Sequence, residues 1–163
     1  MQAVTLRMAR PQDAAAMTQL QRASWLGVYA SVLGNDLLEQ MSEAEHEQVW
    51  QRRLEEGARP MLVCVDEVPV GLLYWQQEGT QAWIRALYLH PAHWRQGLGQ
   101  RLWHTVALQM RRAGCDAVHL WLLAGNRIGA GFYFRQGFRP TGERRTLVSL
   151  GHDCVQHRLA RSL

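Results

Sequence analysis

The amino-acid sequence predicts a mixed α/β (α+β) fold, with a mostly antiparallel central sheet of about seven strands flanked by about four helices. Short apolar runs bounded by turn residues predict the strands, and longer stretches with apolar residues at helical spacing predict the helices. The middle of the chain favours consecutive hairpins, whereas the later part alternates helix with strand. No internal repeat, low-complexity tract or linker interrupts it, so we expect one domain over residues 1–163.

The predicted elements follow one another without long gaps. Strands are predicted at residues 4–8, 61–65, 70–76, 81–89, 118–123, 138–145 and 154–160. Helices are predicted from the turn at residues 10–13 to about Tyr29, from Ser42 towards Glu56, and at residues 97–113 and 127–136. Asp13 favours the first helix start because a negative charge is stabilising there. Residues 42–45 form a capping box that opens the second helix, and Gly57 ends it.

The composition excludes several classes of protein. A chain of 163 residues buries about two-thirds of its unfolded surface around one core. Its 47% hydrophobic and 20% charged residues are typical of soluble domains, and no apolar run approaches the roughly 20 residues that span a bilayer. The N-terminus lacks the pattern of a secretory signal. We therefore expect a cytoplasmic protein with no membrane partner.

Charge and cysteine content argue against two kinds of site. All 18 basic residues are arginine, the formal net charge is +4, and the arginines are scattered rather than gathered in one basic stripe, so no nucleic-acid partner is expected. The three cysteines, Cys64, Cys115 and Cys154, are odd in number and widely spaced, which favours packed thiols over disulfides or a metal site. No metal is expected.

A glycine-bearing turn follows the predicted strand at residues 81–89. Trp94-Arg95-Gln96-Gly97-Leu98-Gly99 opens the helix that continues with Gln100 and Arg101. A strand that feeds a helix through such a turn directs free backbone N–H groups and the positive end of the helix dipole at one point. The pattern predicts an anion site, although a plain turn would also use glycine.

A second constellation follows the strand at residues 118–123. Asn126 precedes a helix that carries Phe132-Tyr133, and Gly137-Phe138 ends it. Together the two constellations resemble the GNAT superfamily of N-acetyltransferases, in particular a bacterial, small single-domain branch. The resemblance covers nearly the whole chain in element order and is specific in residues 90–101 and 120–138.

The resemblance implies a slot between two adjacent strands that splay apart, with acetyl-CoA, the co-substrate, inserted between them. Leu87, Tyr88 and Leu89 would hydrogen-bond the pantetheine arm through their backbone. The remaining implied contacts to acetyl-CoA come from Arg95, Gln96, Gly97, Leu98, Gly99, Gln100, Arg101, Asn126 and Phe132. Arg95 and Arg101 are equally well explained as solvated arginines at a helix end, and Asn126 as a helix N-cap. The family turn usually begins with Gln or Arg, and here that position is Trp94.

Tyr133 matches the family position of the general acid that protonates the departing thiolate. A thiol titrates near 8.5 and a phenol near 10, so this proton transfer is modestly uphill and requires only proximity. Without the motif spacing, the residues alone would favour a core tyrosine on an amphipathic helix, beside Phe132 and Phe134.

The general base is missing from its usual place. Relatives often carry Glu or Asp on the strand before the phosphate turn, whereas this chain has residues 83–86, Trp-Ile-Arg-Ala. Glu78, His119 or a water relay are the candidate replacements. A different explanation is an acceptor already neutral at the working pH, such as an arylamine or an α-amino group.

The acceptor side is implied to come from the first two helices and the late hairpin. Trp25 and Tyr29 share a helical face and are candidate substrate-binding residues, although core packing also explains them. Asp36, Glu39 and the loop at residues 146–153 lie on the same side. The predicted function is acetyl transfer from acetyl-CoA to a primary amine of a small molecule, such as a polyamine or arylamine, by direct attack in a ternary complex.

Alternatives remain open at this stage. The acceptor could be a peptide or protein N-terminus, the domain could be a non-catalytic acyl-CoA-binding sensor, or the glycine turn could hold a nucleotide. The resemblance also implies a homodimer, for which residues 147–148 and the strand at 154–160 could provide an edge.

Overall fold

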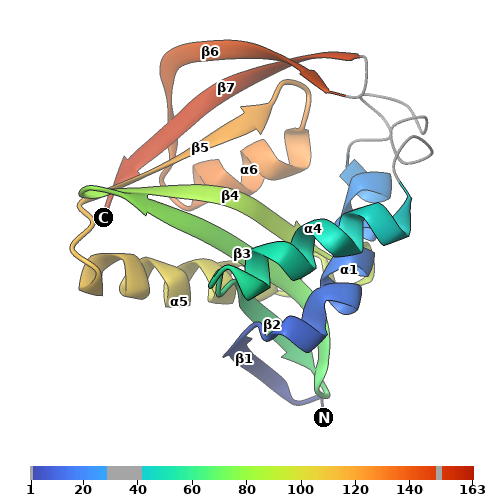
Figure 1. Cartoon of the computed structure of the whole chain (residues 1–163). Helices are drawn as coiled ribbons and strands as arrows, with labels where there is room; N and C mark the ends of the chain where they lie inside the picture. The colour runs from blue at the N-terminus through green and yellow to red at the C-terminus, as the bar shows by residue number, and fades with distance from the viewer. Residues whose placement is uncertain (1, 29–41, 150–151) are drawn as a thin grey trace.

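The computed structural model describes residues 2–28, 42–149 and 152–163, and these form one seven-stranded sheet with helices on both faces (Figure 1). The strand order is β1-β2-β3-β4-β5-β7-β6, and every neighbouring pair is antiparallel except β4–β5. The strands are β1 (Val4–Met8), β2 (Met61–Val65), β3 (Val68–Glu78), β4 (Gln81–Leu89), β5 (Ala117–Leu123), β6 (Arg139–Ser149) and β7 (His152–Ser162). The α-helices are α1 (Ala14–Val28), α4 (Glu43–Glu55), α5 (Leu98–Arg112) and α6 (Arg127–Arg135). The predicted fold class is confirmed.

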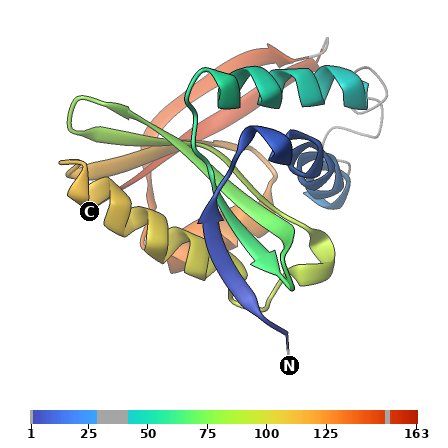
Figure 2. The same ribbon diagram turned by 60° about the horizontal axis from the view of Figure 1, so that its bottom comes forward.

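Two apolar layers hold the helices against the sheet. On one face, Met17 of α1 and Trp50 of α4 pack with Leu62 and Leu72 of the central strands, and all four are fully buried. On the other face, the amphipathic helix α5 buries Leu102 and its neighbours against β2 to β5. Figure 2 shows α5 on the opposite side of the sheet from α1 and α4.

Two predicted boundaries are wrong. The first hairpin turn is only Asp66 and Glu67, both with positive φ (49° and 71°), so β3 begins at Val68 rather than at residue 70. Two central residues with positive φ make a tight turn whose twist suits a hairpin. The region predicted as a loop at residues 146–153 is mostly strand, because Thr146 pairs with Val155 and the β6–β7 ladder continues to its end.

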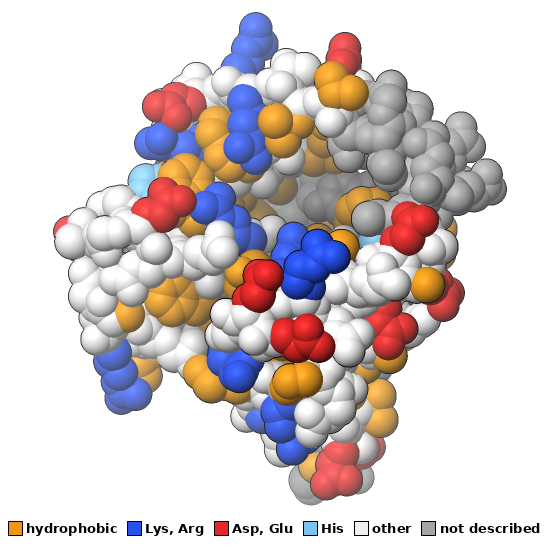
Figure 3. Space-filling model, in the orientation of Figure 1, with side chains coloured by type: hydrophobic (Ala, Val, Ile, Leu, Met, Phe, Trp, Pro, Cys, Tyr) orange, Lys and Arg blue, Asp and Glu red, His pale blue; other side chains and the backbone are white. Residues whose placement is uncertain are grey.

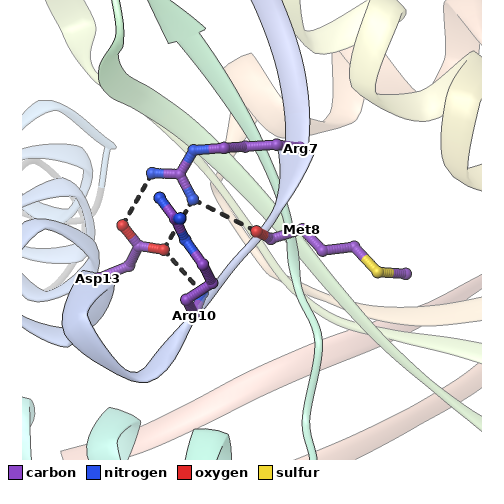
Figure 4. A network of polar contacts seen from close by, with 4 residues as sticks. All are labelled: Arg7, Met8, Arg10 and Asp13. Atoms are coloured by element: carbon purple, nitrogen blue, oxygen red, sulfur yellow. Dashed lines mark hydrogen bonds and ion pairs between the residues drawn. The ribbon is translucent and has the colours of Figure 1, made fainter.

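Arg7 of β1 and Asp13, at the entry to α1, fix the first helix to the sheet (Figure 4). The guanidinium donates to both carboxylate oxygens, at 2.8 and 2.9 Å, and the backbone N–H of Arg10 donates to the same carboxylate at 2.7 Å. These hydrogen bonds, chiefly those from Arg7, lower the pKa of Asp13 below its ordinary value. The pair sets where α1 starts, and therefore which α1 residues reach the centre of the sheet.

The parallel strands β4 and β5 separate soon after they begin. They pair at only three positions, the last of which joins Trp83 to His119. Beyond it β4 stays paired with β3 as far as Leu89, and β5 stays paired with β7 as far as Leu123. The register of β3 against β4 shifts at Arg85, which lies just past the point of separation. The sheet is therefore open along one line, as the resemblance implies (Figure 1).

Candidate active site

A cavity of about 1080 Å³ occupies the space between the separated strands. Its walls come from β4, the turn before α5, β5 and α6, and from Ser24 and Val28 of α1 on the other face of the sheet. Figure 3 shows a hollow on the face that carries α1 and α4, bordered by hydrophobic and arginine side chains. The cavity is at the upper end of the size range of ligand pockets, and it reaches both faces.

The edge of β4 presents free backbone groups to this cavity. His90 N–H donates to Val70 O of β3, so the alternation of an antiparallel ladder also turns the backbone of Tyr88 towards β3. Leu87 and Leu89 therefore direct their N–H and C=O groups away from β3, into the opening. The indole N–H of Trp94 donates a hydrogen bond to the carbonyl oxygen of Leu89, at 3.0 Å. Trp94, which departs from the family pattern, thus anchors the turn to the strand.

The glycine turn has the geometry of an anion site. Gly97 is the residue before α5 and has φ of 76°, a conformation that strains any other residue. The N–H groups of Leu98, Gly99 and Gln100 begin the helix without an intrahelical acceptor and lie at the cavity wall. A Cβ on Gly99 would lie 3.1 Å from the Phe132 ring. The bare glycine thus allows α5 and α6 to approach closely.

Asn126 and Tyr133 form the opposite wall, on and before α6. Asn126 is 8% exposed and caps α6, its side-chain oxygen accepting from Gly129 N–H at 2.9 Å. Only its Nδ2 group is then left to meet a ligand. Tyr133 is 9% exposed, and its ring packs edge-on against Phe138 at 5.4 Å and Phe132 at 5.3 Å. These contacts hold the phenol in a fixed position in the wall.

Not every predicted residue lines the cavity. Gln96 and Arg101 lie beside the turn but outside the lining, whereas Arg95 is part of it. Trp25 turns towards α4 and meets the His46 ring edge-on at 5.8 Å. The α1 residues at the wall are one position earlier on the helix, at Ser24 and Val28. Tyr29, Asp36 and Glu39 lie outside the described residues.

The two candidate bases differ in position. Glu78 is exposed at the end of β3, opposite Gln81 of β4, where its carboxylate accepts from Arg85 at 2.9 Å, and it is not among the residues that line the cavity. His119 lies where the strands part, and its Nε2 is 2.6 Å from the Gln81 side-chain oxygen. Burial, followed by the charge of Arg158, lowers the pKa of His119 below 6.5. The imidazole is therefore neutral at pH 7.

Sequence reasoning predicted Arg95 but missed three other arginines at the cavity. The described lining includes four arginines and no carboxylate; they are Arg85, Arg95, Arg127 and Arg135. Arg127 and Arg135 belong to α6 and flank the predicted Phe132-Tyr133 pair, which was the available signal for them. Trp121 of β5 also lies in the wall, although nothing in its local sequence distinguishes it from a core residue.

Two further properties bear on the kind of site. Within residues 2–28, 42–149 and 152–163, no three His, Cys, Asp or Glu side chains gather as metal ligands would. None of the helices among these residues is long and apolar enough to span a bilayer.

Comparison with known proteins agrees with this geometry. The PaiA N-acetyltransferase of Thermoplasma acidophilum, solved with coenzyme A, superposes with a TM-score of 0.77 at 18% identity over 99% of both chains. YncA of Salmonella typhimurium, solved with its cofactor acetyl-CoA, has a TM-score of 0.72 at 20% identity over 99% of this chain and 94% of its own. At these identities the two structures show a shared fold.

Comparisons of sequence identify a family as well as a fold. The N-acetyltransferase YuaI of Bacillus subtilis is 26% identical over 144 residues, covering 84% of this chain and 80% of its own. The sequence profile of the acetyltransferase (GNAT) family matches residues 15–138, from α1 to the end of α6 and the adjoining Phe138. That match spans the glycine turn, the splayed strands and the Asn126–Tyr133 wall. The chain therefore belongs to the acetyltransferase (GNAT) family.

Proposed function

We propose that this protein transfers the acetyl group of acetyl-CoA to a primary amine of a small molecule, within a ternary complex. One observation carries the proposal: the glycine turn and the Asn126–Tyr133 wall lie on the same cavity, between strands that expose unpaired backbone. CoA ligands bound to structural neighbours support the identity of the co-substrate. The part of the cavity lined by Ser24 and Val28 of α1 supports a small amine as the acceptor.

The cavity fits a long ligand with a phosphate-bearing end. The N–H groups of residues 98–100 would hold the pyrophosphate, assisted by Arg95, and Gly97 keeps those groups aimed into the cavity. Leu87 and the N–H of Leu89 would bind pantetheine amides, as an added strand would, and Asn126 would donate through Nδ2. Phe132 would pack against the pantetheine arm, because its ring extends from α6 towards Gly99 of α5.

Acetyl-CoA supplies a thioester whose carbonyl carbon bonds to the amine nitrogen while the carbon–sulfur bond breaks and CoA leaves. Tyr133 would give its phenol proton to the departing sulfur. The proton lost by the amine would return the phenol to its starting state, through solvent or a nearby base. The net products are the N-acetyl amine and CoA thiol, so the protein ends unchanged.

His119 is the better placed of the two candidate bases. Its neutral ring lies where β4 and β5 part, whereas the Glu78 carboxylate is exposed and bound to Arg85. An alkyl ammonium with a pKa near 10.4 is neutral about once per thousand molecules at pH 7, a cost of roughly 4 kcal/mol. Nε2 of His119 donates to Gln81 and its Nδ1 is buried, so a water chain that starts at the cavity would carry this proton to the imidazole or to solvent.

The test is release of free thiol from acetyl-CoA against a panel of small amines, short peptides and a no-amine control. Amine-dependent thiol release, with the N-acetyl amine identified by mass, is the expected result. Turnover confined to peptides would replace the small-molecule proposal with N-terminal acetylation. Stabilisation by acetyl-CoA without turnover of any acceptor would contradict the proposed enzyme activity and favour a non-catalytic binder.

A further inference from the structure

The positive charge at the cavity extends beyond what the glycine turn explains. Arg95 belongs to the turn and Arg127 and Arg135 to α6, but Arg85 lies on β4 near the point where the strands separate. It lies in the middle of β4, two residues past the last β4–β5 pair. No carboxylate lies among the described lining residues, and of the four arginines Arg85 has an ion-pair partner among the described residues, Glu78.

A second arginine, Arg145, packs on a residue of the facing wall and is not itself among the lining residues. Trp121 of β5 is two residues past the last β4–β5 pair, as Arg85 is on β4, so the two flank the same opening. The guanidinium of Arg145, from β6, lies 4.3 Å from the Trp121 ring centroid. Its Nε donates to the Gln156 side chain at 2.7 Å, which fixes the group over the ring. β4 and β6 therefore bring Arg85 and Arg145 to the end of the cavity where the strands part, which we call the acceptor end.

The two guanidinium groups are unequally neutralised. Arg85 donates to Glu78 and to the Gln76 side chain. Arg145 has no ion-pair partner among the described residues. Desolvation, followed by the charge of Arg85, lowers the pKa of Arg145, so the two charges act on each other across the opening. An anion placed there would relieve this repulsion, whereas a polycation would add to it.

Aromatic rings lie beside this end of the cavity; Trp121 is part of the lining, whereas Trp83 and His119 adjoin it. Trp83 and His119 stack with centroids 4.8 Å apart where the strands join, and Trp121 carries Arg145 on the adjoining wall. A planar guanidinium fixed on an aromatic face keeps its N–H donors pointing outwards and binds carboxylate or phosphate oxygens in pairs. The surface is therefore matched to an oxyanion attached to a small organic molecule.

We infer that the acetyl acceptor is an amine that carries its own anionic oxygen group, a carboxylate or a phosphate, which binds between Arg145 and Arg85. This inference rests on the proposed function and narrows its acceptor class. It ranks amino acids and amino phosphates above polyamines as acetyl acceptors. The amine would then lie deeper in the cavity, towards Tyr133.

Matched acceptors test the inference without reference to a known substrate. Phenylalanine is compared with phenylalaninamide, and O-phosphoethanolamine with ethanolamine, with spermidine as the polycation, all by thiol release. The anionic member of at least one pair should have a kcat/KM at least about tenfold higher, because a charge-assisted hydrogen bond is worth that much or more. The pair that shows the preference distinguishes carboxylate from phosphate. This preference should shrink as ionic strength rises.

Arg145→Gln should reduce the anionic-to-neutral kcat/KM ratio by about tenfold to a hundredfold, through KM rather than kcat, and Arg145→Lys should restore part of it. Arg112→Gln, at an exposed position at the end of α5, matches the lost charge and should leave the ratio unchanged. Stabilisation by CoA checks that each variant is folded. An unchanged ratio in Arg145→Gln would overturn the inference.

Preference for the neutral amines or spermidine would also overturn the inference while leaving acetyl transfer intact. If no amine is acetylated, the same pairs are compared by thermal shift with CoA present. Selective stabilisation by the anionic members, lost in Arg145→Gln, would uphold the anion site although the enzyme activity failed. Equal shifts for both members of each pair would reject it.

Discussion

The imidazole of His119 stacks on the indole of Trp83, with ring centroids 4.8 Å apart, at the last position where β4 and β5 are paired. The two rings mark the junction from which the cavity opens. Nε2 of His119 faces the Gln81 oxygen at 2.6 Å, so it carries the ring proton and leaves Nδ1 as the acceptor. Nδ1 is buried and has no partner among the described residues. Protonating this ring would place a second N–H in an unsatisfied position.

The pH dependence of stability follows from this histidine and from His46. Burial is the largest cause that lowers the pKa of each below 6.5, so the unfolded chain binds more protons than the folded chain just below that pH. The free energy of unfolding should therefore be highest above pH 6.5 and fall as the pH drops towards the folded pKa values. Urea denaturation at pH 7.5, 6.5 and 5.5 measures the fall.

Replacing both residues, His46→Gln with His119→Gln, should flatten that decline relative to the original protein. His104→Gln, at an exposed position of α5, is the matched control and should leave the decline in place. A decline of equal steepness in the double variant would show that other groups cause the acid sensitivity.

Tyr133→Phe tests the assignment of the general acid. Removing the phenol proton should lower kcat by about a hundredfold or more, within the range for general acid catalysis, while the affinity for CoA stays within about twofold. Tyr74→Phe removes a phenol that contacts Gln76, away from the cavity, and should retain normal turnover. Equal rates for Tyr133→Phe and the original protein, measured by thiol release, would refute the role.

Gly97→Ala tests the glycine turn. An alanine at φ of 76° should destabilise the fold by about 1–2 kcal/mol and, by shifting the first N–H groups of α5, weaken CoA binding by about tenfold. Gly142→Ala has the same kind of strain, at φ of 91°, but lies in β6 away from the cavity. Calorimetric titration should show weaker CoA binding only in the Gly97 variant; identical affinities would contradict the phosphate assignment.

Asp13→Asn tests the anchor of α1. The change leaves the Arg7 guanidinium without its carboxylate and weakens the bond from Arg10 N–H, so it should cost about 2–3 kcal/mol of unfolding free energy. Asp116→Asn alters an exposed carboxylate with one side-chain hydrogen bond and should cost less than about 0.5 kcal/mol. A cost for Asp13→Asn no larger than the control would show that the pair does not hold the helix.

The contribution of the Arg7–Asp13 pair to the stability of the fold also depends on pH. Because the folded pKa of Asp13 is lowered, its contribution is present above the ordinary value for aspartate and is lost as the pH falls through the folded pKa. Acid denaturation of Asp13→Asn should therefore show a smaller loss of stability below pH 4 than the original protein. The same titration of Asp116→Asn should follow the original.

Local sequence signals predicted the elements and the glycine turn because each depends on neighbours in the chain. Ser42 caps α4 by accepting from Glu45 N–H, and Gly97 takes the positive φ that its turn demands. Which face of α1 lines the cavity was harder to predict. Trp25 packs against His46 of α4 while Ser24 lines the cavity, and both positions depend on contacts between elements that the local sequence does not show.

The acceptor end could not be read from local sequence at all. Arg145 comes to lie on Trp121 because β6 pairs with β7, which pairs with β5, so the contact depends on the order of the strands in the sheet and not on neighbours in the chain. The start of β3 was misjudged for a simpler reason: Asp66 and Glu67 adopt positive φ without a glycine, which residue preferences disfavour.

The central claim, that the cavity between β4 and β5 binds acetyl-CoA, is tested most directly by thermal unfolding of the protein titrated with acetyl-CoA, and with CoA and ATP in parallel. A ligand that binds only the folded state stabilises it by about 2.7 kcal/mol at a hundredfold excess over its dissociation constant. We expect saturable stabilisation by acetyl-CoA and CoA that is larger than any shift with ATP. No shift with acetyl-CoA or CoA at millimolar concentration would contradict the claim.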